Sequence, residues 1–167
     1  MNASSVISIR DEGALDLIRS LLKQGVSVRI RVSGNSMQPF LNGGEIIEIA
    51  SPAVQPPKIG DIVLFRDRQG NPLVHRLLRR RYYNGVLHLQ AKGDARTGFD
   101  SPVPVDQVLG VVRRIIFTDR KIADLQASLM RLKGSCIAIR SVFFYYLIRV
   151  IFFFKTIARS LIRRSTL

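Results

Sequence analysis

The stretch VSVRIRV (residues 26–32) leads directly into SGNSMQPFL (residues 33–41). In the first segment apolar residues occupy every second position from Val26 to Val32, which is the pattern of a half-buried strand. The second segment is rich in small, turn-forming residues, so we expect Ser36 in a tight turn at the end of that strand. A hydroxyl held on such a scaffold is how a serine nucleophile is displayed, although a plain turn between two strands has the same pattern.

Two later stretches carry the groups that a serine nucleophile requires, a nearby base and a group that orients the base. LVHRL (residues 73–77) reads as a strand with His75 on its apolar face. AKGDARTGFD (residues 91–100) places Asp94 and Asp100 around a glycine-containing loop. Taken singly, such a histidine is more often a packed core residue and such acids more often cap turns. Together they suggest a catalytic set in the order Ser, His, Asp.

These stretches, in this order and spacing, resemble the signal peptidase I family of serine endopeptidases over residues 26 to 115. The resemblance is carried by four short boxes: Ser36-Met37-x-Pro39, Gly60-Asp61-Ile62-Val63, Val74-His75-Arg76, and Lys92-Gly93-Asp94 with Asp100 further on. A histidine rather than a lysine in the third box is similar to the archaeal and endoplasmic-reticulum members. The more distantly similar self-cleaving repressors, which share this β fold, use a lysine.

The resemblance implies that Ser36 is the nucleophile and His75 the general base. It further implies that Asp100 orients His75, and that Asp94 supports the site or shares that role. The substrate would be a peptide or preprotein chain with small residues before the cleaved bond, bound by strand addition. The family often places a hydroxyl residue two positions before the nucleophile, where this chain has Gly34, so the second oxyanion donor is left open.

The rest of the chain predicts a mostly β fold of the signal-peptidase and self-cleaving-repressor type, with an N-terminal helix and a helical C-terminal tail. Residues 1–117 form the predicted catalytic domain, and apolar residues at helical spacing place its helix at 11–24. Further strands are expected at 45–49, 61–66 and 108–117, and Asn84-Gly85 is a hairpin signal. Arg76 and Arg79–Arg81 are interpreted as one solvated basic edge.

Residues 118–167 form a basic, hydrophobic segment that we expect to be helical. Residues 113–167 hold 12 Lys/Arg against two Asp/Glu, which accounts for +10 of the formal net charge of +14. A first helix is predicted at 119–133, and the residues beyond it have basic and apolar arcs on a helical projection. That pattern predicts contact of residues 137–164 with an anionic membrane surface, the alternative being a helical hairpin packed on the domain or in a dimer.

Several function classes are disfavoured by composition. Two histidines and the single Cys136 have no metal-ligand spacing, so neither a metal nor a cofactor is expected, and no intrachain disulfide can form. No nucleic-acid motif accompanies the positive charge. The charged first 25 residues do not resemble an export segment, so we expect membrane association through the tail, by default on the cytoplasmic side. A catalytically inactive, membrane-associated binding module on the same scaffold is the alternative function.

Overall fold

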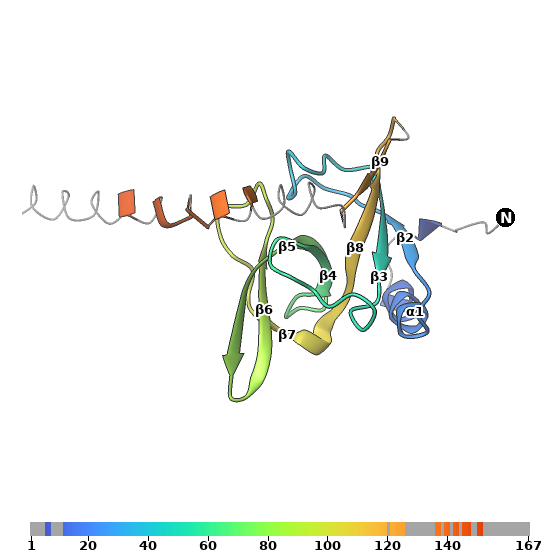
Figure 1. Ribbon diagram of the computed structural model, residues 1–167, viewed down its shortest axis with the longest axis horizontal. Helices are drawn as coiled ribbons and strands as arrows, with labels where there is room; N and C mark the ends of the chain where they lie inside the picture. Colours follow the sequence, from blue (N-terminus) through green and yellow to red (C-terminus); the bar gives the residue numbers. More distant parts are fainter. Residues whose placement is uncertain are drawn as a thin grey trace, which may run out of the picture.

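The computed structural model describes residues 6–7, 12–119 and 121–125, together with residues 136–137, 139–140, 142–143, 145–147 and 150–151. Within these residues the fold is mostly β: nine strands form one sheet in the order β1-β2-β3-β8-β4-β5-β6-β7, and β9 pairs with β8 outside this path. Neighbouring strands are antiparallel except for the parallel pair β1 and β2. The sheet is strongly curled, and the β5–β6 hairpin projects from it (Figure 1).

The elements of the sheet and its helices have the following bounds: β1 Val6–Ile7, α1 Glu12–Lys23, β2 Val28–Arg31, β3 Ile46–Ala50, β4 Ile62–Arg66, β5 Pro72–Tyr83, β6 Val86–Lys92, β7 Val103–Pro104, the 3₁₀ helix η1 Val105–Gln107, β8 Val108–Ile116 and β9 Ile122–Asp124.

Strand β4 is buried on both faces because the sheet curls around it. Ile62 and Leu64 belong to a core cluster shared with α1, β2, β3 and β8. Val63 and Phe65 point the other way, into a second cluster shared with β5, β6 and β7. An unbroken apolar run is therefore required at β4, whereas the half-buried strands alternate. His75 lies directly opposite Val63 on β5, so its ring enters the rim of the second cluster.

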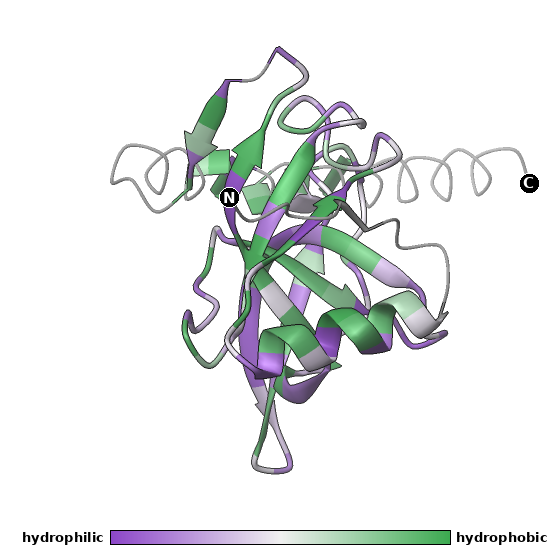
Figure 2. Cartoon of the chain, turned by 90° about the vertical axis from the view of Figure 1, so that its right-hand side faces the viewer, coloured by the Kyte–Doolittle hydropathy of each residue, from purple (hydrophilic) through white to green (hydrophobic). Residues whose placement is uncertain are grey.

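The predicted helix at 11–24 is confirmed, with observed bounds Glu12–Lys23. Leu15, Ile18 and Leu22 form its buried face, and α1 lies across the sheet against β2 and β8 (Figure 2). The outer side of the helix is exposed and mostly polar, although it includes Leu17, which is 52% exposed. The helix thus covers the first core cluster.

Gly110 makes the close approach of α1, β3 and β8 possible. A Cβ at this position would collide with the Ile49 side chain and lie 2.9 Å from the Ala50 carbonyl oxygen and 3.2 Å from Leu22 Cδ1. We expect Gly110→Ala to lower the free energy of unfolding by about 1–3 kcal/mol, because the backbone carbonyl cannot move aside. Chemical denaturation measures this.

The matched control for Gly110→Ala is Gly13→Ala on α1, where a Cβ would meet nothing within 4 Å. That change should be neutral or stabilising, since alanine is the better helix former. Equal destabilisation by the two changes would contradict the packing role of Gly110.

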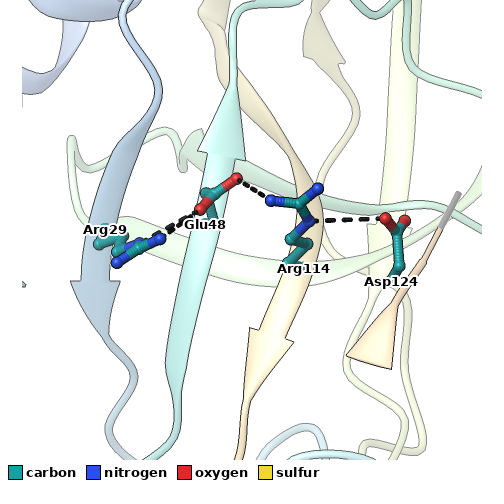
Figure 3. A network of polar contacts seen from close by, with 4 residues as sticks. All are labelled: Arg29, Glu48, Arg114 and Asp124. Atoms are coloured by element: carbon teal, nitrogen blue, oxygen red, sulfur yellow. Dashed lines mark hydrogen bonds and ion pairs between the residues drawn. The ribbon is translucent and has the colours of Figure 1, made fainter. Parts of the chain in front are cut away.

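A ladder of charges crosses the exposed face of four adjacent strands (Figure 3). Arg29 donates from Nη2 to Glu48 at 3.0 Å, Arg114 approaches the same carboxylate at 3.6 Å, and Arg114 Nε lies 3.5 Å from Asp124. These residues are directly opposite one another in the strand register. The alternating signs favour this register over a shift by one residue, which would also expose the buried face.

The sequence prediction is wrong at the start of the C-terminal segment. A helix was expected over 119–133, but Ile122–Asp124 form β9, antiparallel to β8. Ala123 is buried in the first core cluster, and the Leu125 N–H donates to the Arg113 carbonyl at 2.7 Å. Pairing with the free edge of β8 therefore outweighs the local helical pattern, and the sheet extends beyond residue 117. Residues 126–133 lie outside the described residues.

Two further predictions concern strand ends. The Asn84-Gly85 turn is confirmed, with positive φ of 49° and 78° at its two residues, and it joins β5 to β6. The strand expected at 26–32 is shorter in the structure: β2 spans Val28–Arg31, and Val26, which precedes it, is 48% exposed.

The C-terminal segment is described at only some of its positions, and each described residue from 136 to 151 has helical backbone. The remainder of the predicted tail lies outside the described residues. Among the residues that the structure describes, no helix is long and apolar enough to cross a membrane.

Candidate active site

Ser36 lies in a compact loop that connects β2 to β3. Two backbone hydrogen bonds of 2.9 Å between Val32 and residues Gly44 and Glu45 close the neck of the loop. Met37 and Leu41 are buried in the first core cluster, so the role expected for Met37, core packing, is observed. Because these side chains hold the loop from within, Ser36 is kept half-buried at its outer side.

His75 stands at the centre of the site. Its ring is only 3% exposed, and it comes from β5, the strand next to buried β4. Nε2 lies 2.9 Å from Ser36 Oγ, and Nδ1 lies 2.7 Å from Asp100 Oδ2. The structure thus brings together three residues that are 39 and 25 positions apart in sequence.

Asp100 is held in place by its own backbone. Its N–H donates to the Ala91 carbonyl at 3.0 Å, and its carbonyl accepts from Gln90 Nε2 at 3.1 Å. A carboxylate only accepts hydrogen bonds, so the Nδ1 proton belongs to the His75–Asp100 bond. Nε2 is then left as an acceptor for the Ser36 hydroxyl. This arrangement permits a proton to pass from the hydroxyl to the imidazole.

Asp94 does not face His75, which resolves the choice between the two acids. Its two oxygens accept from Arg76 Nε at 2.9 Å and Nη2 at 2.7 Å. Arg76 also donates to the Gly60 carbonyl at 2.8 Å and lies over the Phe40 ring at 4.8 Å. Asp94 therefore ties the loop of residues 93–100, the acid loop, to strand β5 and to the loop of residues 32–45 that carries Ser36, the serine loop.

The interpretation of Arg76 as part of a solvated edge is wrong. Its side chain and that of Asp94 are both only 2% exposed. Arg80 and Arg81 are exposed as expected. Arg76 differs because it follows His75 at the buried end of β5, where the alternation turns it toward Phe40 and the acid loop.

The buried Arg76–Asp94 pair should matter for stability more than for chemistry. We expect Asp94→Asn to lower the free energy of unfolding by about 3–5 kcal/mol, because it leaves a buried guanidinium without its countercharge. The matched control is Asp16→Asn, which breaks an ion pair to Arg66 whose acid is 71% exposed. That loss should not exceed about 1 kcal/mol. Similar denaturation midpoints for the two variants would contradict the proposed role of the buried pair.

Gly93 is a site residue that the sequence reasoning missed. A Cβ on it would lie 2.5 Å from the Ser36 carbonyl oxygen and 3.1 Å from His75 Nε2. Next to it, the Ala95 N–H donates to the same Ser36 carbonyl at 2.9 Å. The acid loop therefore packs directly on the serine loop, and only glycine fits at the contact. The position of Gly93 between a strand end and an acid was the available signal.

Lys92 is buried beside the site, and burial lowers the pKa of its ammonium group. The carboxylates of Asp94 and Asp100 act in the opposite direction, and the positive charge of Arg140 lowers the pKa further. Its Nζ donates to the Gly93 carbonyl at 3.3 Å. The nitrogen that meets the Ser36 hydroxyl is that of His75, as the sequence predicted.

No protein-family model matches this chain, and a search of curated proteins finds no match either.

Proposed function

We propose that this protein is a serine endopeptidase of the signal peptidase I type, on a β scaffold of that family's kind. The observation that carries the proposal is the continuous hydrogen-bond chain from Ser36 through His75 to Asp100. A hydroxyl, an imidazole and a carboxylate in this order make an activated nucleophile on unrelated folds. The order of the four sequence boxes also supports a serine peptidase of this type.

In this proposal Ser36 Oγ attacks the carbonyl carbon of the scissile bond while His75 Nε2 takes the hydroxyl proton. The resulting imidazolium, held by Asp100, gives that proton to the leaving amine as the C–N bond breaks. Water then hydrolyses the acyl-enzyme by the same exchange in reverse. Among the described residues the Ser36 N–H has no hydrogen-bond acceptor, so it is available to bind the developing oxyanion.

We also propose that the C-terminal segment holds the enzyme at an anionic membrane surface. Apart from Tyr146, whose hydroxyl accepts a hydrogen bond from Arg79, the exposed large apolar residues of its described part recur at helical spacing: Ile139, Phe143, Leu147, Val150 and Ile151. Such a stripe, together with the local excess of positive charge, is typical of a helix that lies in the membrane interface. Flotation with phosphatidylglycerol vesicles should retain the protein at low salt and release part of it at high salt. Equal flotation with neutral vesicles would contradict an electrostatic contribution to membrane binding.

A catalytically inactive binding module remains the second candidate. The observation that favours it is Gly34, which has no side chain with which to supply the second oxyanion donor. Such a module would keep the scaffold and the tail but would not turn over a peptide.

Covalent labelling with a fluorophosphonate separates the two candidates. A serine peptidase should be labelled at Ser36, as identified by mass spectrometry of the labelled peptide, and Ser36→Ala should not be labelled. Labelling at the same slow rate in both proteins would leave only the binding module.

A further inference from the structure

A pocket of about 270 Å³ lies beside the candidate active site, between the acid loop and the C-terminal segment. Lys92 lines it from the end of β6, Asp94 to Thr97 line it from the acid loop, and Ile137 and Arg140 line it from the C-terminal segment. Lys92 and Asp94 belong to the Lys92-Gly93-Asp94 box, whereas Arg96 and Arg140 have no role in the sequence prediction of the site.

The pocket adjoins the proposed nucleophile. Ala95, one of its lining residues, donates from its N–H to the Ser36 carbonyl at 2.9 Å. The Cβ position of Gly93 lies 2.5 Å from that carbonyl and 2.9 Å from Arg96 Cγ. The stem of Arg96 therefore lies within a few bond lengths of the serine loop. The pocket therefore contacts the serine loop through the Ser36 backbone, and we expect a peptide whose scissile bond is at Ser36 to place a nearby residue there.

Positive charge dominates the pocket. Lys92, Arg96 and Arg140 bring three cationic groups, and both oxygens of Asp94, the acid in the lining, are already bonded to Arg76. Within the part of the chain that the structure describes, neither Arg96 nor Arg140 forms an ion pair. Cations brought together in this way repel one another, and a bound anion would relieve the repulsion.

Arg140 reaches the pocket because the C-terminal segment is docked next to the acid loop. Arg79 on β5 donates to the Tyr146 hydroxyl at 2.9 Å and stacks over Phe99, with 4.1 Å from Cζ to the ring centroid. The Tyr145 ring packs edge-on against Phe99 at 4.7 Å. Phe99 directly precedes Asp100, so the same contacts that hold the segment also support the acid of the triad.

We propose that this pocket is a substrate subsite for an acidic side chain close to the scissile bond, with Arg96 and Arg140 as its specificity-determining residues. The subsite rests on the proposed peptidase function. Guanidinium groups bind carboxylates through two parallel hydrogen bonds, which gives both affinity and orientation. A peptide carboxylate fits this place better than a lipid phosphate because the pocket lies beside Ser36, where a peptide must pass.

The test uses the full chain with Ser36→Ala, so that binding is measured without turnover. The probes are N-acetylated hexa-alanine amides with one glutamate moved through the six positions, and the same series with glutamine. At one or two positions the glutamate peptide should bind about tenfold tighter than its glutamine counterpart. One additional charge-assisted hydrogen bond raises affinity by about this factor. Adding Arg140→Gln or Arg96→Gln should remove this gain. Arg81→Gln, which removes an exposed arginine of the β5–β6 hairpin, should keep it.

Each other outcome overturns the subsite: equal binding of the two peptide series, no binding of either, or a glutamate preference that survives both arginine replacements. If the replacements weaken flotation with phosphatidylglycerol vesicles and leave the peptide preference intact, the pocket serves a lipid phosphate and the proposal is wrong. Fluorophosphonate labelling of Ser36 tests the peptidase function separately. Labelling without a glutamate preference rejects only the subsite, and a glutamate preference without labelling rejects only the catalysis.

Discussion

Replacing His75 by glutamine should lower the rate of fluorophosphonate labelling of Ser36 by up to about 10⁶-fold, the scale of loss when the base of a serine–histidine pair is removed. The reason is geometric: Nε2 lies 2.9 Å from Ser36 Oγ and is the acceptor that the hydroxyl proton requires. Glutamine has a similar reach and polarity, but its amide cannot take up that proton near neutral pH. Labelling kinetics followed by mass spectrometry measures the loss.

The matched control for this prediction is the other histidine. His88 lies on β6, where its ring packs edge-on against Tyr83 at 5.1 Å and its Nδ1 lies 3.1 Å from the Val86 carbonyl. His88→Gln should label at the rate of the unchanged protein. A His75→Gln variant that is folded and still labels at that rate would show that His75 is not the base.

Asp100→Asn should lower the labelling rate by about 10⁴-fold while leaving the fold intact. An asparagine amide at this place can donate to His75 Nδ1, which moves the imidazole proton to Nε2. The Ser36 hydroxyl then faces a donor in place of an acceptor, and the nucleophile is no longer activated. His75 Nδ1 lies 2.7 Å from Asp100 Oδ2, so the amide of an asparagine at position 100 would contact Nδ1 directly.

Asp100 and Asp94 can be told apart by measuring rate and stability on the same variants. Asp100→Asn should lose labelling with little change in the denaturation midpoint, since the Asp100 side chain is 19% exposed and its backbone bonds remain. Asp94→Asn should show the reverse, with its main effect on the midpoint. If Asp94→Asn abolishes labelling at full stability, then the assignment of the orienting acid to Asp100 is wrong.

Most of the elements that form the site could be predicted from local patterns. Alternation and apolar runs predicted strands close to β3, β4 and β8, and helical spacing predicted α1 within a residue at each end. The Asn84-Gly85 turn was predictable because its two residues are those that tolerate positive φ. Strand β9 was missed because its stability comes from pairing with β8 and from burying Ala123, and neither interaction is visible in a local window.

The supporting residues of the site were harder to predict. Arg76 resembles its neighbours Arg79 to Arg81 in sequence, and only its burial and its bonds to Asp94 set it apart. Gly93 resembles an ordinary loop glycine until the serine loop is packed against it. Arg140 lies 44 positions beyond Arg96, yet the two line one pocket through the docking of Tyr145 and Tyr146.

Local sequence patterns were enough to place a serine in the turn-forming stretch after one strand and a histidine on the apolar face of another, with two acids following. These properties depend on periods of two and on turn residues, which act over a few positions. Long-range packing selects which acid meets the imidazole, because Asp94 and Asp100 have the same chemistry and lie in the same loop. The physical difference between them is their partner: Asp94 neutralises a buried arginine, and this leaves Asp100 to hold His75 against Ser36.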